Sequence, residues 1–254
     1  MSRWKLLDID NNSYTIPDDS LRILERSFKI ETDIIEKSFR AGADFPGIQR
    51  DTSAEIGFKY DYNINDEQTF RTYLNTLIMN LRKSVILQDT VNQIQTDILL
   101  SEKSISYDEG GFNFGSQNEI TFKQLRPFWE DIISTDVSFT GYTSGQVIID
   151  NQGYIETPPV ITLYAEGPVT KISIRVNETG EGIVIKDLQF GSLGLNVYII
   201  DCKEGTSELS GVNRNNMIQN GTGFFNLKVG TNTLQFEFDG NRAVDISYKK
   251  RYWI

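Results

Sequence analysis

Length, composition and charge exclude several classes of protein. The chain has 254 residues, with 35 acidic and 25 basic side chains, one cysteine and no histidine. Without histidine it has no Ser-His-Asp or Cys-His nucleophile system and no histidine-bound metal. One cysteine excludes a disulfide framework within the chain, and a net charge of −10 disfavours the wrapping of nucleic acid, which depends on Lys and Arg contacts to phosphates.

Targeting and membrane signals are not recognisable. The apolar stretch within Met1–Asp10 is too short for a signal peptide, and the segment carries too many charges. The chain also lacks the continuous apolar run of about 20 residues that a transmembrane helix needs. We therefore expect synthesis in a cytosol, no export by a signal peptide and no membrane insertion.

Charge and glycine are distributed unevenly along the chain. Residues 1–140 hold 15 basic and 23 acidic side chains, whereas residues 141–254 hold 10 and 12. Glycine shows the opposite trend, with 6 in the first part and 14 in the second. Two composition regimes predict two domains, at 1–138 and 139–254, with Phe139–Gly145 as a linker or turn.

Two early segments allow more than one interpretation. Asp8–Asn12 resembles the start of a calcium loop, but Ser13 stands where the sharp turn needs Gly and Asp19 where a bidentate Glu is expected. A strand end followed by a polar turn is therefore favoured. Residues 20–40 fit either an amphipathic helix or two strands separated at residues 31–33, and the pattern alone does not decide between them.

The helix with the clearest pattern is expected at Asp66–Lys83. Asn65 can serve as its N-cap, with Gln68 completing a capping box. Arg82 and Lys83 lie in its last turn and complement the helix dipole. One apolar stripe runs along it at helical spacing: Phe70, Leu74, Leu77, Ile78 and Leu81. Such a stripe is typical of a helix that packs on a core.

The remainder of the first part is expected to be β-structure. Residues 92–100 and 119–126 are strand-like, and Asp108–Gly111 has the composition of a hairpin tip. The first domain is thus predicted to be β-rich with one helix.

The second part is predicted to be entirely β. Apolar and polar residues alternate in four runs, which places each apolar set on one face of a strand: Ile172–Val176, Phe225–Val229, Leu234–Phe238 and Val244–Tyr248. More continuously apolar runs at Ile183–Ile185 and Leu195–Ile200 are typical of inner strands. Short strands at this spacing indicate a sandwich or barrel.

Residues that carry chemistry in other proteins have simpler interpretations here. Three pairs of neighbouring carboxylates could in principle serve glycoside hydrolysis: Asp108/Glu109, Glu130/Asp131 and Glu178/Glu181. That reaction needs carboxylates held apart across a cleft, so solvated turn charge is the favoured interpretation. We expect no catalytic residue, no metal and no cofactor.

Small-residue segments and the lone cysteine give no functional motif. Gly191–Gly194 and Gly221–Gly223 match neither a phosphate-binding loop nor a dinucleotide fingerprint, so they are interpreted as β-turns. Cys202 follows an apolar run and is interpreted as a buried small hydrophobe.

The three tryptophans lie near the start, the middle and the end of the chain. Trp4, Trp129 and Trp253 are expected to pack in cores or between domains, as buried tryptophans usually do. An aromatic platform for a glycan is the alternative. The His-x-Asn-x-Arg strand of galectin-type sugar sites is impossible in a chain without histidine.

Several strings occur in an order that resembles one family. They are Arg126–Trp129, Asn151–Tyr154, Pro158–Ile161, Glu166–Thr170, Lys228–Asn232 and Val244–Trp253. As an ordered set covering most of residues 120–254, they resemble the distal tail proteins (Dit) of long-tailed bacteriophages that infect Gram-positive hosts. The helix and the size of the first part agree with the N-terminal domain of that family.

The resemblance implies a mainly β protein with a structural role in the virion. An N-terminal domain would close into a hexameric ring between the tail tube protein and the tail-tip protein, and DNA would pass through its lumen without specific binding. A galectin-like β-sandwich would lie outside the ring and could hold receptor-binding or adaptor proteins. The host cytoplasm would be the place of synthesis.

Interface residues follow from combining this ring with the expected elements. We expect ring contacts on the helix and on the 103–118 hairpin: Phe70, Leu74, Asp108, Glu109, Phe112 and Phe114. Trp129 and Trp253 are expected to pack between the domains.

Charge and composition leave further hypotheses open. An acidic first domain around a lumen would repel DNA and let it slide. Two other functions are a carbohydrate-binding module that uses exposed tyrosines of the second part, and a hydrolase of cell-wall glycans.

Overall fold

The chain divides into two compact units. The computed structural model describes residues 3–16, 21–35, 49–62, 67–104, 118–126, 128–140, 144–165, 169–186, 197–239 and 242–253. One unit comprises Met1–Ile132 with Ile254, and the other comprises Ile133–Trp253. The boundary expected at 138/139 lies inside a strand of the second unit, Thr135–Thr140.

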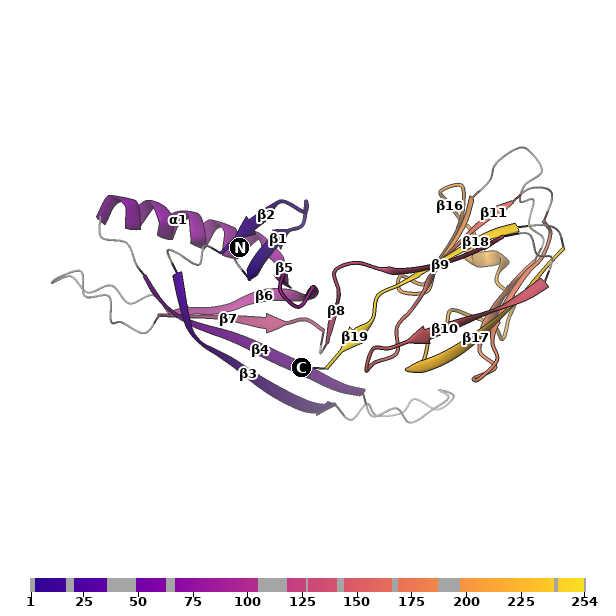
Figure 1. Cartoon of the computed structure of the whole chain (residues 1–254), viewed down its shortest axis with the longest axis horizontal. Coiled ribbons are helices and arrows are strands. Elements are labelled where there is room, and N and C mark those ends of the chain that lie inside the picture. The colour runs from indigo at the N-terminus through magenta and orange to yellow at the C-terminus, as the bar shows by residue number, and fades with distance from the viewer. Residues whose placement is uncertain are drawn as a thin grey trace. The chain divides into compact units, whose positions relative to one another are not determined.

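The first unit is one antiparallel sheet with a helix on it (Figure 1). Its elements are β1 Trp4–Asp8, β2 Ser13–Thr15, β3 Leu21–Ile35, β4 Gln49–Tyr62, α1 Glu67–Lys83, β5 Ser84–Asp89, β6 Ile94–Ser104, β7 Asn118–Gln124 and β8 Trp129–Asp131. The strand order is β2-β1-β5-β6-β7-β4-β3, and β8 pairs with β6. Helix α1 lies next to β1.

The helix and two of the strands expected in this unit are confirmed. Helix α1 ends at Lys83 as expected, while Asn65 and Asp66 lie outside the described residues. The strands expected at 92–100 and 119–126 correspond to β6 and β7. The hairpin tip expected at Asp108–Gly111 lies outside the described residues.

Both interpretations of residues 20–40 are wrong. Residues Leu21–Ile35 form one continuous strand, β3, which pairs with β4 along its whole length. Tertiary pairing with a long partner strand therefore decides a segment whose local pattern fits two structures.

The core of the first unit lies between α1 and the sheet. Leu77 and Leu81 of α1 are buried to 1% exposure. They belong to one cluster with buried residues of six strands and of the segment that follows β2: Trp4, Leu6, Ile16, Ile56, Leu87, Ile98, Ile120, Phe122 and Trp129. Alternate strand residues point to this face, because successive side chains of a strand lie on opposite sides of the sheet.

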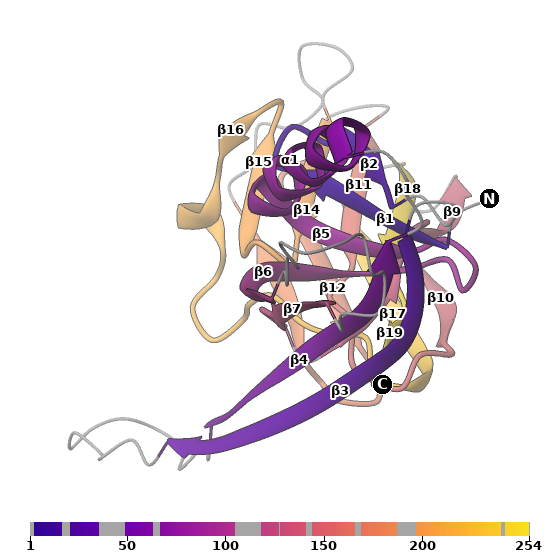
Figure 2. The same ribbon diagram turned by 90° about the vertical axis from the view of Figure 1, so that its left-hand side faces the viewer.

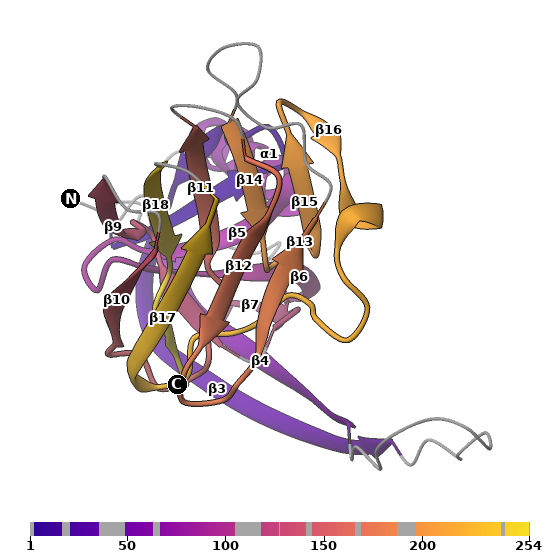
Figure 3. The same cartoon turned by 90° about the vertical axis from the view of Figure 1, so that its right-hand side faces the viewer.

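The second unit contains two sheets (Figure 3). Its elements are β9 Thr135–Thr140, β10 Ser144–Asn151, β11 Val160–Ala165, β12 Ile172–Val176, β13 Gly182–Ile185, β14 Val197–Asp201, β15 Thr206–Leu209, β16 Val212–Asn213, the short 3-10 helix η1 Asn215–Met217, β17 Gly230–Phe238, β18 Arg242–Tyr248 and β19 Arg251–Tyr252. One sheet has the order β10-β17-β12-β13, and the other has the order β16-β15-β14-β11-β18-β9.

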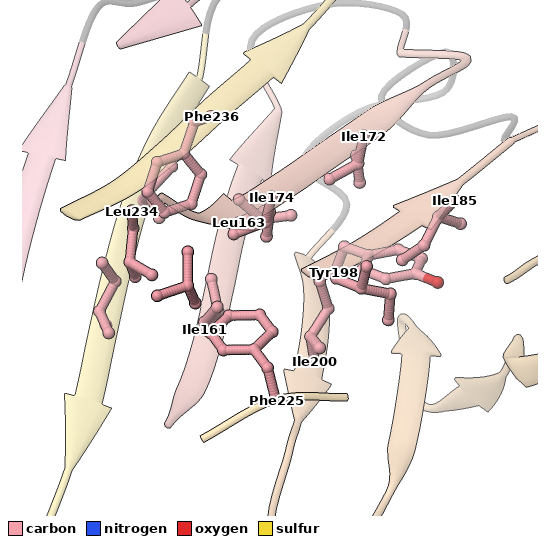
Figure 4. Packing of buried hydrophobic residues seen from close by; sticks show 14 of the residues in the cluster. Ile161, Leu163, Ile172, Ile174, Ile185, Tyr198, Ile200, Phe225, Leu234 and Phe236 are labelled. Atoms are coloured by element: carbon pink, nitrogen blue, oxygen red, sulfur yellow. The ribbon is translucent and has the colours of Figure 1, made fainter. Parts of the chain in front are cut away.

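A single apolar core fills the space between these two sheets. Figure 4 shows Ile161, Leu163 and Ile200 of one sheet facing Ile174, Leu234 and Phe236 of the other. The alternating sequence of β12, β17 and β18 supplies one buried face from each strand. The expectation of a mainly β fold is confirmed, and the second unit is a β-sandwich.

Two expectations for this unit are wrong. The segment Phe225–Val229 is not a strand; apart from a bridge between Leu227 and Thr157 it is irregular, although Phe225 and Leu227 are buried. Its alternation reflects burial without a ladder of hydrogen bonds. Of the two alternatives for Phe139–Gly145, a linker or a turn, the linker between the units is wrong, because the segment connects β9 of one sheet to β10 of the other.

Candidate functional site

All six expected ring contacts fall on residues whose side chains are not described. Asp108, Glu109, Phe112 and Phe114 lie outside the described residues. Phe70 and Leu74 lie in α1, but the structure does not describe their side chains. These six residues stay predictions.

The last turns of α1 use their apolar side chains within the first unit. Leu77 and Leu81 are buried, while Thr76 and Met79 on the other side of the helix are exposed. Hydrogen bonds from the Thr76 hydroxyl to the Thr72 carbonyl and from the Asn80 amide to the Thr76 carbonyl follow the helix axis. This part of the stripe therefore serves the core, as the spacing indicated.

Trp129 is fixed in the first unit by a buried polar network. The Gln124 amide donates to the Thr96 hydroxyl at 2.7 Å and to the Phe128 carbonyl at 2.9 Å. The Thr96 hydroxyl donates to the same carbonyl at 3.0 Å. Trp129 is fully buried, with its ring centroid 6.4 Å from that of Trp4. Sequence reasoning missed this network, since neither Thr96 nor Gln124 has a motif around it.

Trp253 differs from the other two tryptophans. Its exposed fraction is 57%, and the neighbouring Tyr252 ring makes an edge-to-face contact with Tyr154 at 6.0 Å between centroids. A role of Trp129 and Trp253 in packing between the units stays a prediction.

The hairpin of β3 and β4 extends past its sheet (Figure 2). Strand β7 pairs with β4 only over Ala54–Tyr60, whereas β3 pairs with β4 out to Ile35 and Gln49. Residues 31–35 and 49–53 therefore form a two-stranded ribbon without a third strand in the described structure. At about 3.4 Å per residue this ribbon, which we call the arm, is about 17 Å long. An isolated two-stranded ribbon is marginally stable in water, so the arm is a candidate surface for contact with another chain.

Acidic residues considered for chemistry are already used as caps of turns. The Asp8 carboxylate accepts hydrogen bonds from the Asn12 side-chain amide and from the backbone N–H groups of Asp10 and Asn12, which lowers its pKa. The expected polar turn is thus present at the calcium-like string. Glu178 accepts two hydrogen bonds from the Thr233 N–H, which lowers its pKa as well.

Other reactive groups give no sign of chemistry in the described part of the chain. No three Asp, Glu, Cys or His side chains lie close enough there to hold a metal ion. Burial raises the pKa of the Cys202 thiol to about 11. None of the described helical segments has the length and apolarity to cross a bilayer.

A comparison with family models finds one match, in the second unit. Residues 152–252 match the family described as the siphovirus-type tail component, C-terminal domain. No curated protein matches the chain.

One solved structure is similar in fold over nearly the whole chain, and two others match at a lower score. The Dit protein of phage SPP1 (gp 19.1), described as a paradigm of the hub adsorption apparatus in phages that infect Gram-positive bacteria, matches with a TM-score of 0.66 and 13% identity over 97% of this chain and 98% of that chain. The baseplate of phage P2 in its activated conformation, solved with Ca or with Sr, matches with a TM-score of 0.49 and 13% identity over 97% of each chain. The resemblance to a distal tail protein is confirmed, and the chain has the Dit fold.

Proposed function

We propose that this protein is the structural hub of a phage tail tip. In this role it forms a hexameric ring that joins the tail tube to the tail-tip protein. One combined observation carries the proposal: a tail-component domain at 152–252 lies in a chain with the Dit fold over 97% of its length. The first unit would close the ring. The second unit would lie outside it and hold a receptor-binding or adaptor protein in the virion.

The arm and the outer edge of β3 support ring closure by the first unit. Strand β3 is the last strand of its sheet, so one edge of its backbone has no neighbour within the described unit. Identical subunits in a ring meet through two different surfaces, one on each side. An arm on one side that grips the next copy provides such a contact, and the partner completes the hydrogen bonding of the ribbon.

The charge of the first part supports passage of DNA without binding. Residues 1–140 carry 23 acidic and 15 basic side chains, and a negative lumen repels a duplex. The role is structural and not catalytic in this proposal, because the described carboxylates with lowered pKa values are held by hydrogen bonds within the fold.

The first experiment measures the mass of the purified chain. Light scattering coupled to size-exclusion chromatography should give about six times 29.0 kDa at high concentration. Negative-stain images should then show rings with a central hole. A strict monomer at every concentration would contradict the ring.

A second experiment tests the arm. Residues 31–53 are replaced by Asn-Gly, which joins Ile30 to its paired residue Ala54 through a tight two-residue turn. The shortened chain should fold, with a circular dichroism spectrum and melting temperature near those of the wild type, but remain monomeric. Glu204→Gln, in an exposed turn of the second unit, is the control and should assemble normally. Full assembly of the shortened chain would exclude the arm as the ring contact.

A further inference from the structure

The second unit has a small pocket at the edge of its four-stranded sheet. Two segments form it: the β12–β13 hairpin, through Arg175, Glu181 and Gly182, and the irregular segment 221–224, through Thr222 and Phe224. Its volume is about 240 Å³. That is below the roughly 300–1,000 Å³ typical of pockets for drug-sized molecules, so it has room for one small ring.

Backbone hydrogen bonds hold the two walls of the pocket together. The Gly223 N–H donates to the Gly182 carbonyl at 2.9 Å, and the Val184 N–H donates to the Thr222 hydroxyl at 3.2 Å. The Thr222 hydroxyl in turn donates to the Gln219 carbonyl at 2.7 Å. Because both walls are fixed before any ligand arrives, binding would not have to order them.

One glycine of the pocket has no structural reason to be glycine. Gly182 is required, since a Cβ there would lie 2.2 Å from the Ile174 carbonyl oxygen. Gly221 has a φ of 82°, which also favours glycine. Gly223 has neither constraint, and a Cβ on it would meet no atom within 4 Å. Its missing side chain therefore leaves space in the pocket that the fold itself does not demand.

The polar groups of the lining carry opposite charges and do not neutralise each other. Arg175 and Glu181 are both exposed, and no ion pair joins them or ties either to another described residue. Among the described residues, the Glu181 carboxylate accepts only a long hydrogen bond, 3.4 Å, from the Thr179 hydroxyl. A guanidinium offers donors and a carboxylate offers acceptors. An anion would be repelled by Glu181 and a cation by Arg175, whereas a neutral molecule with several hydroxyl groups satisfies both.

A row of amide side chains continues from the pocket across the sheet. Arg175 pairs with Gly182 on one side and with Gln235 on the other, and Gln235 pairs with Gln146. Arg175 and Gln235 lie on the face that points away from the core, because their neighbours in each strand are buried, and Gln146 lies on the same face because it pairs with Gln235. Hydrogen-bonding groups therefore repeat at the strand spacing of about 4.8 Å.

We propose that this pocket binds one unit of a neutral saccharide, with Arg175 and Glu181 as its hydrogen-bonding groups and Phe224 as its apolar wall. Gln235 and Gln146 would contact the next unit of the same glycan. Phe224 is half-buried and packs against the core, so it offers a fixed apolar surface to the C–H face of a sugar ring. The site belongs to the second unit alone and does not depend on ring formation.

The test uses saturation-transfer NMR on the full-length protein with glucose, galactose and N-acetylglucosamine as probes. At least one sugar should receive magnetisation from the wild type. Arg175→Met and Gly223→Val should each weaken its binding by about tenfold or more, with Gly223→Ala in between. Lys203→Met, an exposed charge change outside the pocket, should bind as the wild type does.

Controls separate loss of the site from loss of the fold or of the ring. The melting temperature and the assembled mass of each variant should match those of the wild type. Undiminished binding by Gly223→Val would overturn the proposal. So would the absence of a signal from all three sugars, or a signal from inorganic phosphate in place of them, which would make the pocket an anion site.

Discussion

Asp89 joins the N-terminal segment to the sheet of the first unit. Its fully buried carboxylate accepts hydrogen bonds from the Arg3 guanidinium, at 2.6 Å from Nη2, and from the backbone N–H groups of Val91 and Asn92. The Arg3 guanidinium also lies 4.9 Å from the centre of the Trp4 ring. This side chain therefore connects the start of the chain to the turn after β5.

We expect Asp89→Asn to lower the free energy of unfolding by about 2 kcal/mol at neutral pH. Breaking a buried ion pair costs about 3–5 kcal/mol, but Arg3 is 43% exposed and solvent screens its charge. Urea denaturation of both proteins measures the difference. A change below about 0.5 kcal/mol, the usual size for an unimportant surface site, would contradict the role.

The difference between these two proteins should depend on pH. Burial disfavours the charged carboxylate, but the hydrogen bonds from Arg3 and the backbone outweigh it and hold the pKa of Asp89 below its usual value. The stabilisation is then complete above the unfolded pKa, near about 4, and is lost as the pH falls toward the folded pKa. Denaturation curves at decreasing pH should show the two stabilities converging below about pH 4, and a constant gap would count against Asp89 as the cause.

Cys202 should react slowly with thiol reagents in the folded protein. With burial raising its pKa to about 11, only about one thiol in a thousand is ionised at pH 8, and the thiolate is the reactive form. Ellman's reagent at pH 8 should label the native protein much more slowly than protein unfolded in guanidinium chloride. Equal rates would show that the thiol is not protected.

Buried asparagines explain two of the strings that carry the family resemblance. Asn151 accepts from the Gly153 N–H and donates to the Leu227 carbonyl, and Asn232 closes its turn with three hydrogen bonds to Lys228 and Gly230. A Cβ on Gly153 would lie 2.7 Å from the Arg251 carbonyl oxygen. These strings can be recognised in the sequence. Their structural role cannot, because the groups that they contact lie in distant segments of the chain.

Among the elements, strands with one buried face were the most predictable. Strands β12, β17 and β18 alternate because one face contacts the core and the other does not. The hydrophobic pattern did not predict β3, because pairing with the long strand β4 decides its conformation. It also wrongly predicted a strand at Phe225–Val229, where Phe225 and Leu227 are buried but only one bridge forms. The alternation of apolar and polar residues depends on which side chains are buried and not on backbone hydrogen bonding. An irregular segment with alternately buried side chains therefore has the sequence pattern of a strand.

The two faces of α1 should differ strongly in their response to truncation. Leu81→Ala removes a side chain that is 1% exposed and should cost about 2–5 kcal/mol, because a cavity remains. Met79→Ala, at 55% exposure on the same helix, is the matched control and should change stability by less than about 0.5 kcal/mol. Chemical denaturation followed by circular dichroism measures both. Similar losses for the two variants would place Met79 against a surface outside the described unit.

At the scale of the molecule, the two units should unfold separately. Each has its own apolar core, and multi-domain chains commonly depart from two-state unfolding. In calorimetry of the full chain, Asp89→Asn should lower one transition and Asn232→Ala should lower the other. A single transition that both variants shift equally would mean that the units unfold together.

The candidate sites were less predictable than the fold. Trp129 was expected in packing because tryptophan is usually buried, and the structure places it in a core. The polar pocket could not be predicted, because Thr222 is far in the sequence from Arg175 and Glu181, and both Glu181 and Thr222 lie in segments that resemble ordinary turns. Which residues of a surface form contacts in an assembly depends also on the partner's residues. One chain's sequence is therefore not enough to predict them.

The open edge of β3 has a consequence for the chain before it joins other copies. An uncovered strand of this length exposes backbone groups that pair readily with any other strand, and such edges promote aggregation. By contrast, the edge of β13 is covered by hydrogen bonds from segment 217–223. If the proposed ring covers this edge, chains produced faster than they assemble should precipitate, and production at low temperature should raise the soluble yield.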